Sequence, residues 1–433
     1  MRLSRYSVSA TSFEGRAGRF IQQPTGYRAF VPAPLPPNPP LQLNDELLAL
    51  LSEADRALGR LDGVTSVLPN PDLFIAMYVR QEAVLSSQIE GTQSTLEDVL
   101  EWEAGARRGE GPPDVEEVVN YVRAMNYGLE RLQEFPLSLP LLQEIHGVLM
   151  HGVRGGQREP GEFRRSQNWI GAAGCTLQNA TFVPPPVHEM KSALYDFEKW
   201  LHDGSLPVLL HCGLAHVQFE TIHPFLDGNG RVGRLLMTFL LCHRGMLRCP
   251  LLYLSLYLKQ HRAEYYDRLM AVRLHGAWEE WLAFLLRGIA QVSESATTTA
   301  RSILQLRESG RARLFEANVQ TGPATRLFDL LFDQPVITVS LVAERLGCTY
   351  PTAAALVAAF AKPNIGFLEQ VSSGKRNRRF RFKPYMQLWE HPPGFDNSDF
   401  DNNDISPASA ETSVRDASAL APDPGEIQET QNR

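Results

Sequence analysis

The chain has 433 residues, of which 43% are hydrophobic, 9% aromatic and 21% charged. This composition is that of a globular protein and excludes a disordered chain, a collagen-like repeat and a disulfide-stabilised miniprotein, while the length predicts roughly two or three domains. The five cysteines show no Cys-x-x-Cys spacing. They indicate reduced thiols and neither a disulfide framework nor a zinc site.

The net charge of −7 comes from the C-terminal end of the chain. Residues 391–433 contain nine acidic and two basic side chains, so the rest of the chain is neutral. Their Asp, Asn, Ser, Pro and Ala content predicts a disordered acidic tail. No segment resembles a signal peptide or reaches the roughly 20 apolar residues of a membrane span, which predicts a soluble, cytoplasmic protein.

Helical periodicity dominates the first three quarters of the chain. After a proline-rich, extended arm at 32–40, the apolar spacing predicts helices over 41–61, 71–90, 114–133, 136–153, 188–202, 206–220, 231–243 and 259–290. A capping box at Ser94–Glu97 predicts the start of another helix, and 107–113 is predicted to be a loop. Short β-prone pieces at 168–170 and 180–183, among Gly and Pro, predict an inserted hairpin.

The C-terminal region has a different pattern. Helices predicted at 339–346 and 351–362, followed by strands at 366–371 and 378–382 around a turn at 373–374, give the order of a winged helix-turn-helix. Its hairpin carries six basic residues, a plausible phosphate-contacting edge: Lys375, Arg376, Arg378, Arg379, Arg381 and Lys383. The second helix reads AAALVAAFAK and offers almost nothing to base edges, so protein contact is favoured over DNA binding.

The densest chemical signal is HPFLDGNGRVGR at residues 223–234. Gly228 and Gly230 allow successive backbone N–H groups to converge on an anion, just before a helix predicted to begin near Arg231. A polar turn and a calcium-binding loop are the alternatives. The calcium loop is disfavoured because Arg231 stands where a third oxygen ligand is needed.

The other side chains of this segment suit phosphate chemistry. Arg231 and Arg234 lie three residues apart on one helix face, where each can bind a phosphate. Asp227 is a hard oxygen ligand suited to Mg²⁺. His223, with an ordinary pKa of about 6.5, suits a general base. The segment therefore predicts a phosphoryl- or nucleotidyl-transfer site.

Residues 223–234 resemble, without a departure, the signature H-x-F-x-[D/E]-G-N-G-R-x-x-R of Fic-domain proteins, which transfer AMP from ATP to protein hydroxyl groups. Similar segments surround it, namely Gly161–Arg164, Phe182–Pro186, His216–His223, Tyr253–Ser255 and Tyr265–Tyr266. The resemblance extends from residue 14 to about 290. It implies a mainly α fold: a Fic-type helical core with a β-hairpin flap, joined to the C-terminal winged helix-turn-helix.

The resemblance also implies roles. His223 would take the proton of the target hydroxyl, and Asp227 would hold Mg²⁺ as pyrophosphate leaves. The implied nucleotide-binding residues are Asp227, Gly228, Asn229, Gly230, Arg231, Val232, Gly233, Arg234, Thr181, Phe182, Val183, Tyr265 and Tyr266. The flap at Thr181–Pro185 would hold the target by strand addition. Tyr265 and Tyr266 either line an adenine pocket or belong to the core.

A second motif concerns regulation. Ser86, Glu90 and Gly91 fit the family's inhibitory pattern [S/T]-x-x-x-E-[G/N], on a helix predicted at about 71–91. A carboxylate there can form a bidentate pair with Arg234 and so occupy the arginine that would orient the γ-phosphate. The alternative is a solvated Glu90.

The predicted organisation has five parts: an arm and helices at 1–110, a catalytic core at 111–291, a linker helix at 292–318, the winged module at 319–390 and the tail at 391–433. His146, His151, His211 and His216 are interpreted as packed or capped side chains. Arg164 and Arg165 are interpreted as solvated or as bracing the flap.

Together these features predict an autoinhibited protein adenylyltransferase that uses ATP and Mg²⁺. Its partners would be proteins with hydroxyl side chains, itself included, and relatives of this kind often dimerise. Transfer of another phosphate-containing group, or removal of AMP by the same site, is an alternative. A nucleotide-sensing DNA-binding regulator is another, and its function would survive His223→Ala.

Overall fold

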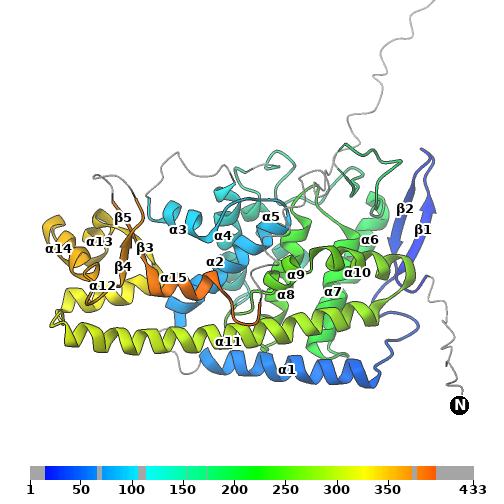
Figure 1. The fold of residues 1–433 in the computed structure, drawn as a ribbon. Coiled ribbons are helices and arrows are strands. Elements are labelled where there is room, and N and C mark those ends of the chain that lie inside the picture. The colour runs from blue at the N-terminus through cyan, green and yellow to red at the C-terminus, as the bar shows by residue number, and fades with distance from the viewer. Residues whose placement is uncertain are drawn as a thin grey trace, which may run out of the picture.

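The computed structural model describes residues 15–65, 71–105, 114–153, 155–172, 174–372 and 378–395, and it is mainly helical (Figure 1). The loop predicted at 107–113, the turn at 373–374, the side chains of Lys375 and Arg376 and the tail from 396 lie outside these residues. Within them, no helix combines the length and apolar character that crossing a bilayer requires.

The helices are α1 (Asp45–Thr65), α2 (Pro71–Ile89), α3 (Leu96–Glu103), α4 (Val115–Arg131), α5 (Leu139–Leu149), α6 (Val187–Leu201), α7 (Val208–Ile222), α8 (Asn229–His243), α9 (Ser255–Gln260), α10 (Arg262–His275), α11 (Trp278–Glu316), α12 (Gly322–Asp333), α13 (Val339–Leu346), α14 (Tyr350–Phe360) and α15 (Lys383–Glu390). The strands are β1 (Gly18–Gln22), β2 (Arg28–Pro32), β3 (Val336–Thr338), β4 (Leu368–Gln370) and β5 (Arg379–Phe382).

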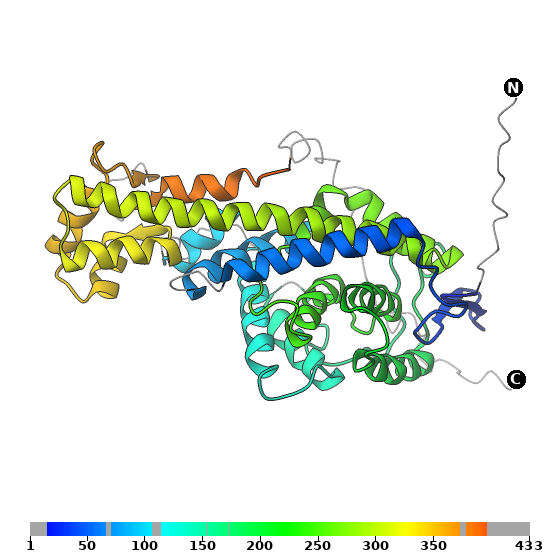
Figure 2. The same cartoon turned by 90° about the horizontal axis from the view of Figure 1, so that it is seen from below.

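Helix α11 runs the length of the molecule, with α1 packed along it (Figure 1 and Figure 2). It spans 39 residues without a break, so the predicted boundary at residue 291 falls inside a helix. The polar stretch that suggested a linker is largely buried, and the Thr297 hydroxyl donates to the Ser293 carbonyl. Ser and Thr hydroxyl groups can donate to carbonyl groups of their own helix in this way, so a polar sequence need not mark a linker.

The helix predicted over 259–290 is instead divided among α9, α10 and α11. Gly276 ends α10 in the left-handed region, with φ +63°. A glycine adopts this conformation without a Cβ penalty, which makes it a common helix C-terminus. The change of direction at Gly276 lets α10 lie against α7 while α11 continues along α1.

Helix α3 begins one residue later than predicted. Thr95 is its N-cap, and Asp98 completes the capping box by accepting the Thr95 backbone N–H. Ser94, predicted as the cap, is buried, and its hydroxyl donates to Asp114. The sequence placed the cap one residue early because Ser and Thr stand side by side before the helix.

Helix α7 forms the centre of the site-bearing region. Every residue from Leu209 to Ile222 is buried, and the helix packs against α6, α8 and α11. An element buried on all sides holds its C-terminal end at a fixed place. The predicted signature begins at that end, with His223 directly after Ile222.

Two β features lie near this region. Strands β1 and β2 form an antiparallel hairpin that the sequence analysis did not predict. The hairpin predicted between 168 and 183 is reduced to one antiparallel bridge, Ile170 with Phe182. The Phe30 N–H of β2 donates to the Val183 carbonyl at 2.9 Å, so β2 supports this flap from one side.

The C-terminal region contains the helices and hairpin in the predicted order, with β3, β5 and β4 forming one antiparallel sheet. Helix α15 follows the hairpin and was not predicted. Its Trp389 packs edge-on against Tyr78 of α2, with ring centroids 4.8 Å apart. This region lies at the opposite end of α11 from the β1–β2 hairpin (Figure 1).

Candidate active site

One cavity of about 490 Å³ collects most of the predicted site residues. It is lined by Glu90, Thr181, Phe182, His223, Asp227, Gly228, Asn229, Gly230, Arg231, Arg234, Tyr265 and Tyr266. Of the residues predicted to bind nucleotide, Val183, Val232 and Gly233 do not line it. The cavity is also lined by charged residues that the sequence analysis did not assign to the site: Glu117, Arg158, Glu220, Arg262 and Arg273.

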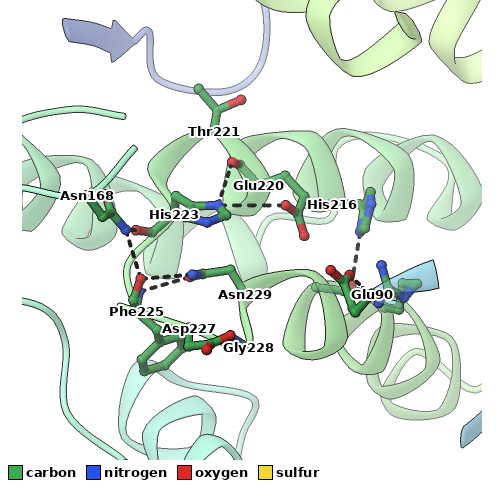
Figure 3. Close-up of polar contacts among 12 residues, drawn as sticks. Glu90, Asn168, His216, Glu220, Thr221, His223, Phe225, Asp227, Gly228 and Asn229 are labelled. Carbon is green, nitrogen blue, oxygen red and sulfur yellow. Dashed lines mark hydrogen bonds and ion pairs between the residues drawn. The ribbon is translucent and has the colours of Figure 1, made fainter. Parts of the chain in front are cut away.

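The loop between α7 and α8 is held by its own side chains. Asn229 accepts the Phe225 N–H at 2.9 Å and donates to the Phe225 carbonyl at 2.8 Å (Figure 3). The Asn229 side chain therefore fixes the loop, whereas the resemblance implied a phosphate contact. The His146 ring stacks on Phe225 with centroids 3.8 Å apart, which agrees with its interpretation as a packed residue.

Helix α8 starts two residues earlier than predicted. Gly228 is the N-cap of α8 at φ +76°, and the helix begins at Asn229. Gly230 therefore lies in the first helical turn, where backbone N–H groups have no intrahelical acceptor and the helix dipole favours an anion. This turn opens into the cavity.

His223 ends α7 in the left-handed conformation, at φ 49° and ψ 62°. Its carbonyl accepts Arg164 Nε at 3.0 Å and Asn168 Nδ2 at 3.2 Å. Its Nδ1 lies 3.3 Å from the Glu220 carbonyl oxygen (Figure 3). Because a carbonyl only accepts, Nδ1 carries the proton, and the Nε2 lone pair is left available.

The pKa of His223 differs from the ordinary value assumed from the sequence. Burial lowers it to about 3, and the charges of Arg273 and Arg164 contribute to the shift. Removing an imidazole from water disfavours its charged form. His223 is therefore neutral throughout the physiological pH range.

Glu90 contacts Arg234 as the inhibitory pattern predicts, but not through two parallel hydrogen bonds. Arg234 Nη2 donates to Glu90 Oε1 at 2.7 Å, and the guanidinium also donates to the Ser86 hydroxyl at 2.8 Å and the Ser86 carbonyl at 3.0 Å. Burial by itself would raise the pKa of Glu90, but Arg234, together with the charges of Arg231 and Arg262, lowers that pKa below its ordinary value. Arg234 thus donates to the Glu90 carboxylate and to both the side chain and the backbone of Ser86.

Two glycines allow this contact. A Cβ at Gly230 would collide with the Glu90 carboxylate, so the glycine gives this carboxylate room beside α8. Gly91 turns the chain after Glu90 with φ +97°. Gly230 of the signature therefore also lies against Glu90.

Arg231 is held by a carboxylate as well. Its Nη1 lies 3.3 Å from Glu117 of α4, and its Nη2 lies 3.8 Å from Asp227. The Arg158 guanidinium is 3.7 Å from the same Asp227 carboxylate. Neither Glu117 nor Arg158 occurs in a recognisable motif, and only their place in the fold brings them to the cavity.

The flap side of the cavity is built around Phe182. Phe182 and Val183 are buried, while Thr181 is exposed. The Arg273 guanidinium lies over the Phe182 ring, 4.1 Å from its centroid. Arg164, fully buried, donates to the Pro185 carbonyl, which supports its interpretation as a flap-bracing residue.

The two tyrosines occupy different positions in the wall. Tyr265 is buried, and its hydroxyl lies 2.8 Å from His216 Nε2, so it belongs to the core as well as to the cavity. Tyr266 is less buried, and the Arg262 guanidinium lies 5.3 Å from its ring centroid. An aromatic ring next to a cation in a cavity wall is suited to stacking with a flat base.

Three basic residues of the C-terminal hairpin pair with carboxylates in the described part of the chain. Arg379 donates to Glu101 of α3 at 2.8 Å. Arg381 lies 3.7 Å from Glu97, also of α3, and Lys383 lies 3.0 Å from Glu369. Arg379 and Arg381 help dock the C-terminal region on α3, and the preference for protein contact over DNA binding stays a prediction.

Fold and site together define a helical protein with a basic, glycine-lined pocket. Comparison with known proteins agrees with the resemblance seen in the sequence: residues 48–130 match the family model "Fic/DOC family N-terminal", and residues 136–241 match "Fic/DOC family". These two regions of the chain are similar to the Fic/DOC family.

Named relatives share part of the chain. Over 185 residues it is 34% identical to "Protein adenylyltransferase Fic" of Drosophila virilis and 31% identical to the protein of the same name from Drosophila melanogaster. The matched region is 41% of this chain and 34% of each relative, so the chain spans about a third of their length.

A solved structure supports the fold. A Fic family protein from Desulfovibrio desulfuricans G20 superposes with a TM-score of 0.51 at 19% identity. The match covers 79% of this chain and 97% of that chain.

Proposed function

We propose that the protein transfers AMP from ATP to Ser, Thr or Tyr hydroxyl groups of target proteins and of itself. The observation that carries this proposal is the single cavity that brings His223, Asp227 and the first turn of α8 together. The names of the matched relatives favour AMP over another phosphate-containing group.

In this reaction His223 Nε2 takes the proton of the target hydroxyl. The hydroxyl oxygen forms a bond to the α-phosphorus, the bond from that phosphorus to the bridging oxygen breaks, and pyrophosphate leaves with the electron pair. A neutral imidazole is the form that this step needs, which the low pKa of His223 supplies. The first turn of α8 would bind the phosphates through its N–H groups and dipole.

Asp227 would hold Mg²⁺. Its carboxylate lines the cavity, and Oδ1 accepts the Gly228 N–H at 2.7 Å, which leaves further lone pairs for a cation. No cluster of three metal-binding side chains occurs among the residues that the structure describes. A Mg²⁺ ion would therefore complete its coordination with phosphate and water oxygens, as it commonly does, and would neutralise phosphate charge.

The Glu90 contact would keep this site inactive. Arg234 lies one turn further along α8 and lines the same cavity, and Glu90 together with Ser86 already uses two of its nitrogens. A triphosphate would have to compete with this carboxylate for Arg234. Displacement of Glu90 would free Arg234 for the γ-phosphate, and Thr181 with Phe182 would position the target chain beside His223.

The test is labelling of the purified protein with Mg²⁺ and ATP carrying the label on either the α- or the γ-phosphate. We expect Glu90→Gly to gain α-label and the mass of AMP, and Glu90→Gly/His223→Ala to gain neither. Glu134→Gly is the matched control, because Glu134 also follows the end of a helix but is exposed. This variant should behave as the parent protein without substitutions. Label from γ would show phosphate transfer, and no label in Glu90→Gly would overturn the proposal.

A further inference from the structure

We propose that Glu220 is a positioning residue for His223, whose carboxylate balances the imidazolium that forms when Nε2 takes a proton. This inference rests on the proposed function, in which His223 is the base. During transfer the proton moves from the target hydroxyl to Nε2, and the positive charge spreads over the ring to Nδ1. A carboxylate beside Nδ1 stabilises that charge without itself reacting.

The geometry begins with the last turn of α7. Glu220 precedes His223 by three residues, and its carboxylate oxygen Oε2 lies 3.8 Å from His223 Nδ1 (Figure 3). Its backbone carbonyl accepts from the same nitrogen at 3.3 Å. One residue thus fixes the tautomer through its backbone and faces the ring with its charge.

The Glu220 carboxylate is not explained by packing. The residue is 6% exposed, and Oε1 has no hydrogen-bond partner in the described part of the chain. Leaving a buried carboxylate oxygen unpaired is unfavourable for stability. The carboxylate fits there because Gly233 has no side chain, since a Cβ at that position would lie 2.5 Å from Oε1.

His223 needs a counter-charge because its other charged neighbours are cations. Arg164 donates to its carbonyl, and the positive charges of Arg164 and Arg273 both disfavour the protonated ring. Within the described residues, no carboxylate other than that of Glu220 forms an ion pair with this imidazole. Without Glu220, the proton transfer would place a third positive charge among two buried guanidinium groups.

The charge of Glu220 is itself set by its surroundings. Burial raises its pKa to about 7, opposed by Arg234 and Arg273 and reinforced by Glu90. The ionisable groups that face it are Arg234 of α8, Glu90 at the end of α2, Arg273, Tyr265 and Tyr266 of α10, and His223. Removal of Glu90 takes away a negative charge, so in Glu90→Gly this pKa moves below about 7.

These charge states predict in which direction the reactivity of His223 changes with pH. His223 is already neutral well below pH 7, whereas Glu220 acquires its charge as the pH rises through its own pKa. The reactivity of His223 should therefore rise with pH in step with Glu220. The pH profile of kcat/KM reports groups of the free enzyme, which makes it the appropriate measure.

The experiment uses two readouts in the full-length Glu90→Gly protein between about pH 5 and 8.5. One is kcat/KM for α-label transfer. The other is the rate at which diethyl pyrocarbonate ethoxycarbonylates His223, followed by the mass of its peptide, with His223→Ala as the blank. The second readout places positive charge on the ring without requiring ATP or a target.

We expect Glu220→Gln to slow both reactions about tenfold or more at the alkaline end and to abolish their rise with pH. Glu220→Asp should retain a rise with pH at a reduced rate. Glu82→Gln is the matched control: Glu82 is equally buried and its pKa is also raised to about 7, but it accepts from Ser255 and Tyr121. The Glu82→Gln variant should keep the rise of both rates with pH. Thermal unfolding should show that all variants are folded.

Identical rates and pH profiles for Glu220→Gln and its parent would overturn the inference. Loss of the rise in Glu82→Gln as well would also overturn it, because the titration would then not belong to Glu220. If no AMP is transferred but ethoxycarbonylation depends on Glu220 as described, the proposed function fails and the positioning role stands. The two proposals are therefore tested separately.

Discussion

The signature loop with α8 and the basic C-terminal hairpin both concentrate arginines in a short segment, yet the fold places them differently. Arg234 and Arg231 contact Glu90 and Glu117 at the wall of a cavity. Arg379 contacts Glu101 of α3, and both side chains are largely buried between two elements. Arginines are thus paired with carboxylates in both regions, and those of the first region line the cavity described above.

The comparison shows that an arginine paired with a carboxylate can bind a new anion only where other donors lie beside it to help displace that carboxylate. At the signature loop, the N–H groups of the first turn of α8 add to the arginines, so an anion that displaces Glu90 gains several donors at once. At the hairpin, Arg379 and Arg381 join the C-terminal region to α3. Their role in this structure is docking, and variants of the two sets should fail in different ways.

The largest effect is expected from Arg234→Ala in the Glu90→Gly protein. Removing one charge-assisted donor to the phosphates should lower kcat/KM for AMP transfer by about 100-fold or more. Arg379→Ala in the same background should leave the rate unchanged. Equal losses in the two variants, measured by α-label incorporation at matched protein concentration, would contradict the distinction between the regions.

A smaller effect, on the free energy of unfolding, is expected from a substitution in the C-terminal hairpin. Arg379→Ala leaves the Glu101 carboxylate, only 4% exposed, without this partner and should lower the free energy of unfolding by about 1–3 kcal/mol. Arg378→Ala is the neighbouring control and should stay within about 0.5 kcal/mol. Urea denaturation measures both, and a double-mutant cycle with Glu101→Ala would show whether the pair itself accounts for the loss.

The smallest effect concerns the pH dependence of the Glu90 contact. Because the pKa of Glu90 is below its ordinary value in the folded protein, its contribution to stability is complete above about pH 4.5. It is lost as the pH falls through the lower, folded-state pKa. The difference in unfolding free energy between the parent protein, which keeps Glu90, and the Glu90→Gln variant should thus shrink by about 1 kcal/mol on acidification.

Glu134→Gln serves as the control for this measurement, because its side chain is exposed. Glu134→Gln should stay within about 0.5 kcal/mol of the parent protein. A Glu90→Gln difference that stays constant down to about pH 3 would mean that the contact with Arg234 does not stabilise the fold.

Much of the helical fold could be predicted from periodicity alone, and the errors have physical causes. Elements with one clear apolar face, such as α6, were placed within about one residue. The boundary predicted at 291 falls inside the continuous helix α11, because its polar residues do not interrupt the helix: Thr297 donates to the Ser293 carbonyl of the same helix, and the Ser295 hydroxyl lies 3.3 Å from that of Tyr253. The β1–β2 hairpin was missed because its pairing depends on contacts with the flap.

The sequence by itself determined the contiguous part of the site. Residues 223–234 form a loop and the first turn of a helix, so local rules for glycine and helix termini were sufficient to predict an anion-binding turn. The pattern of Ser86, Glu90 and Gly91 was also visible, because its residues lie close together in the sequence at the end of α2. The tertiary structure decided which charges meet: Glu117, Glu220 and Arg273 come from three helices, and no spacing in the sequence connects them.

The pKa of His223 likewise depends on the tertiary structure. An imidazole in a sequence has its ordinary pKa until the fold buries it, and α7 is buried along almost its whole length. Burial and long-range charge act through space and are independent of separation along the chain. For that reason the sequence identified the chemical groups of the site, while the fold set their charge states and partners.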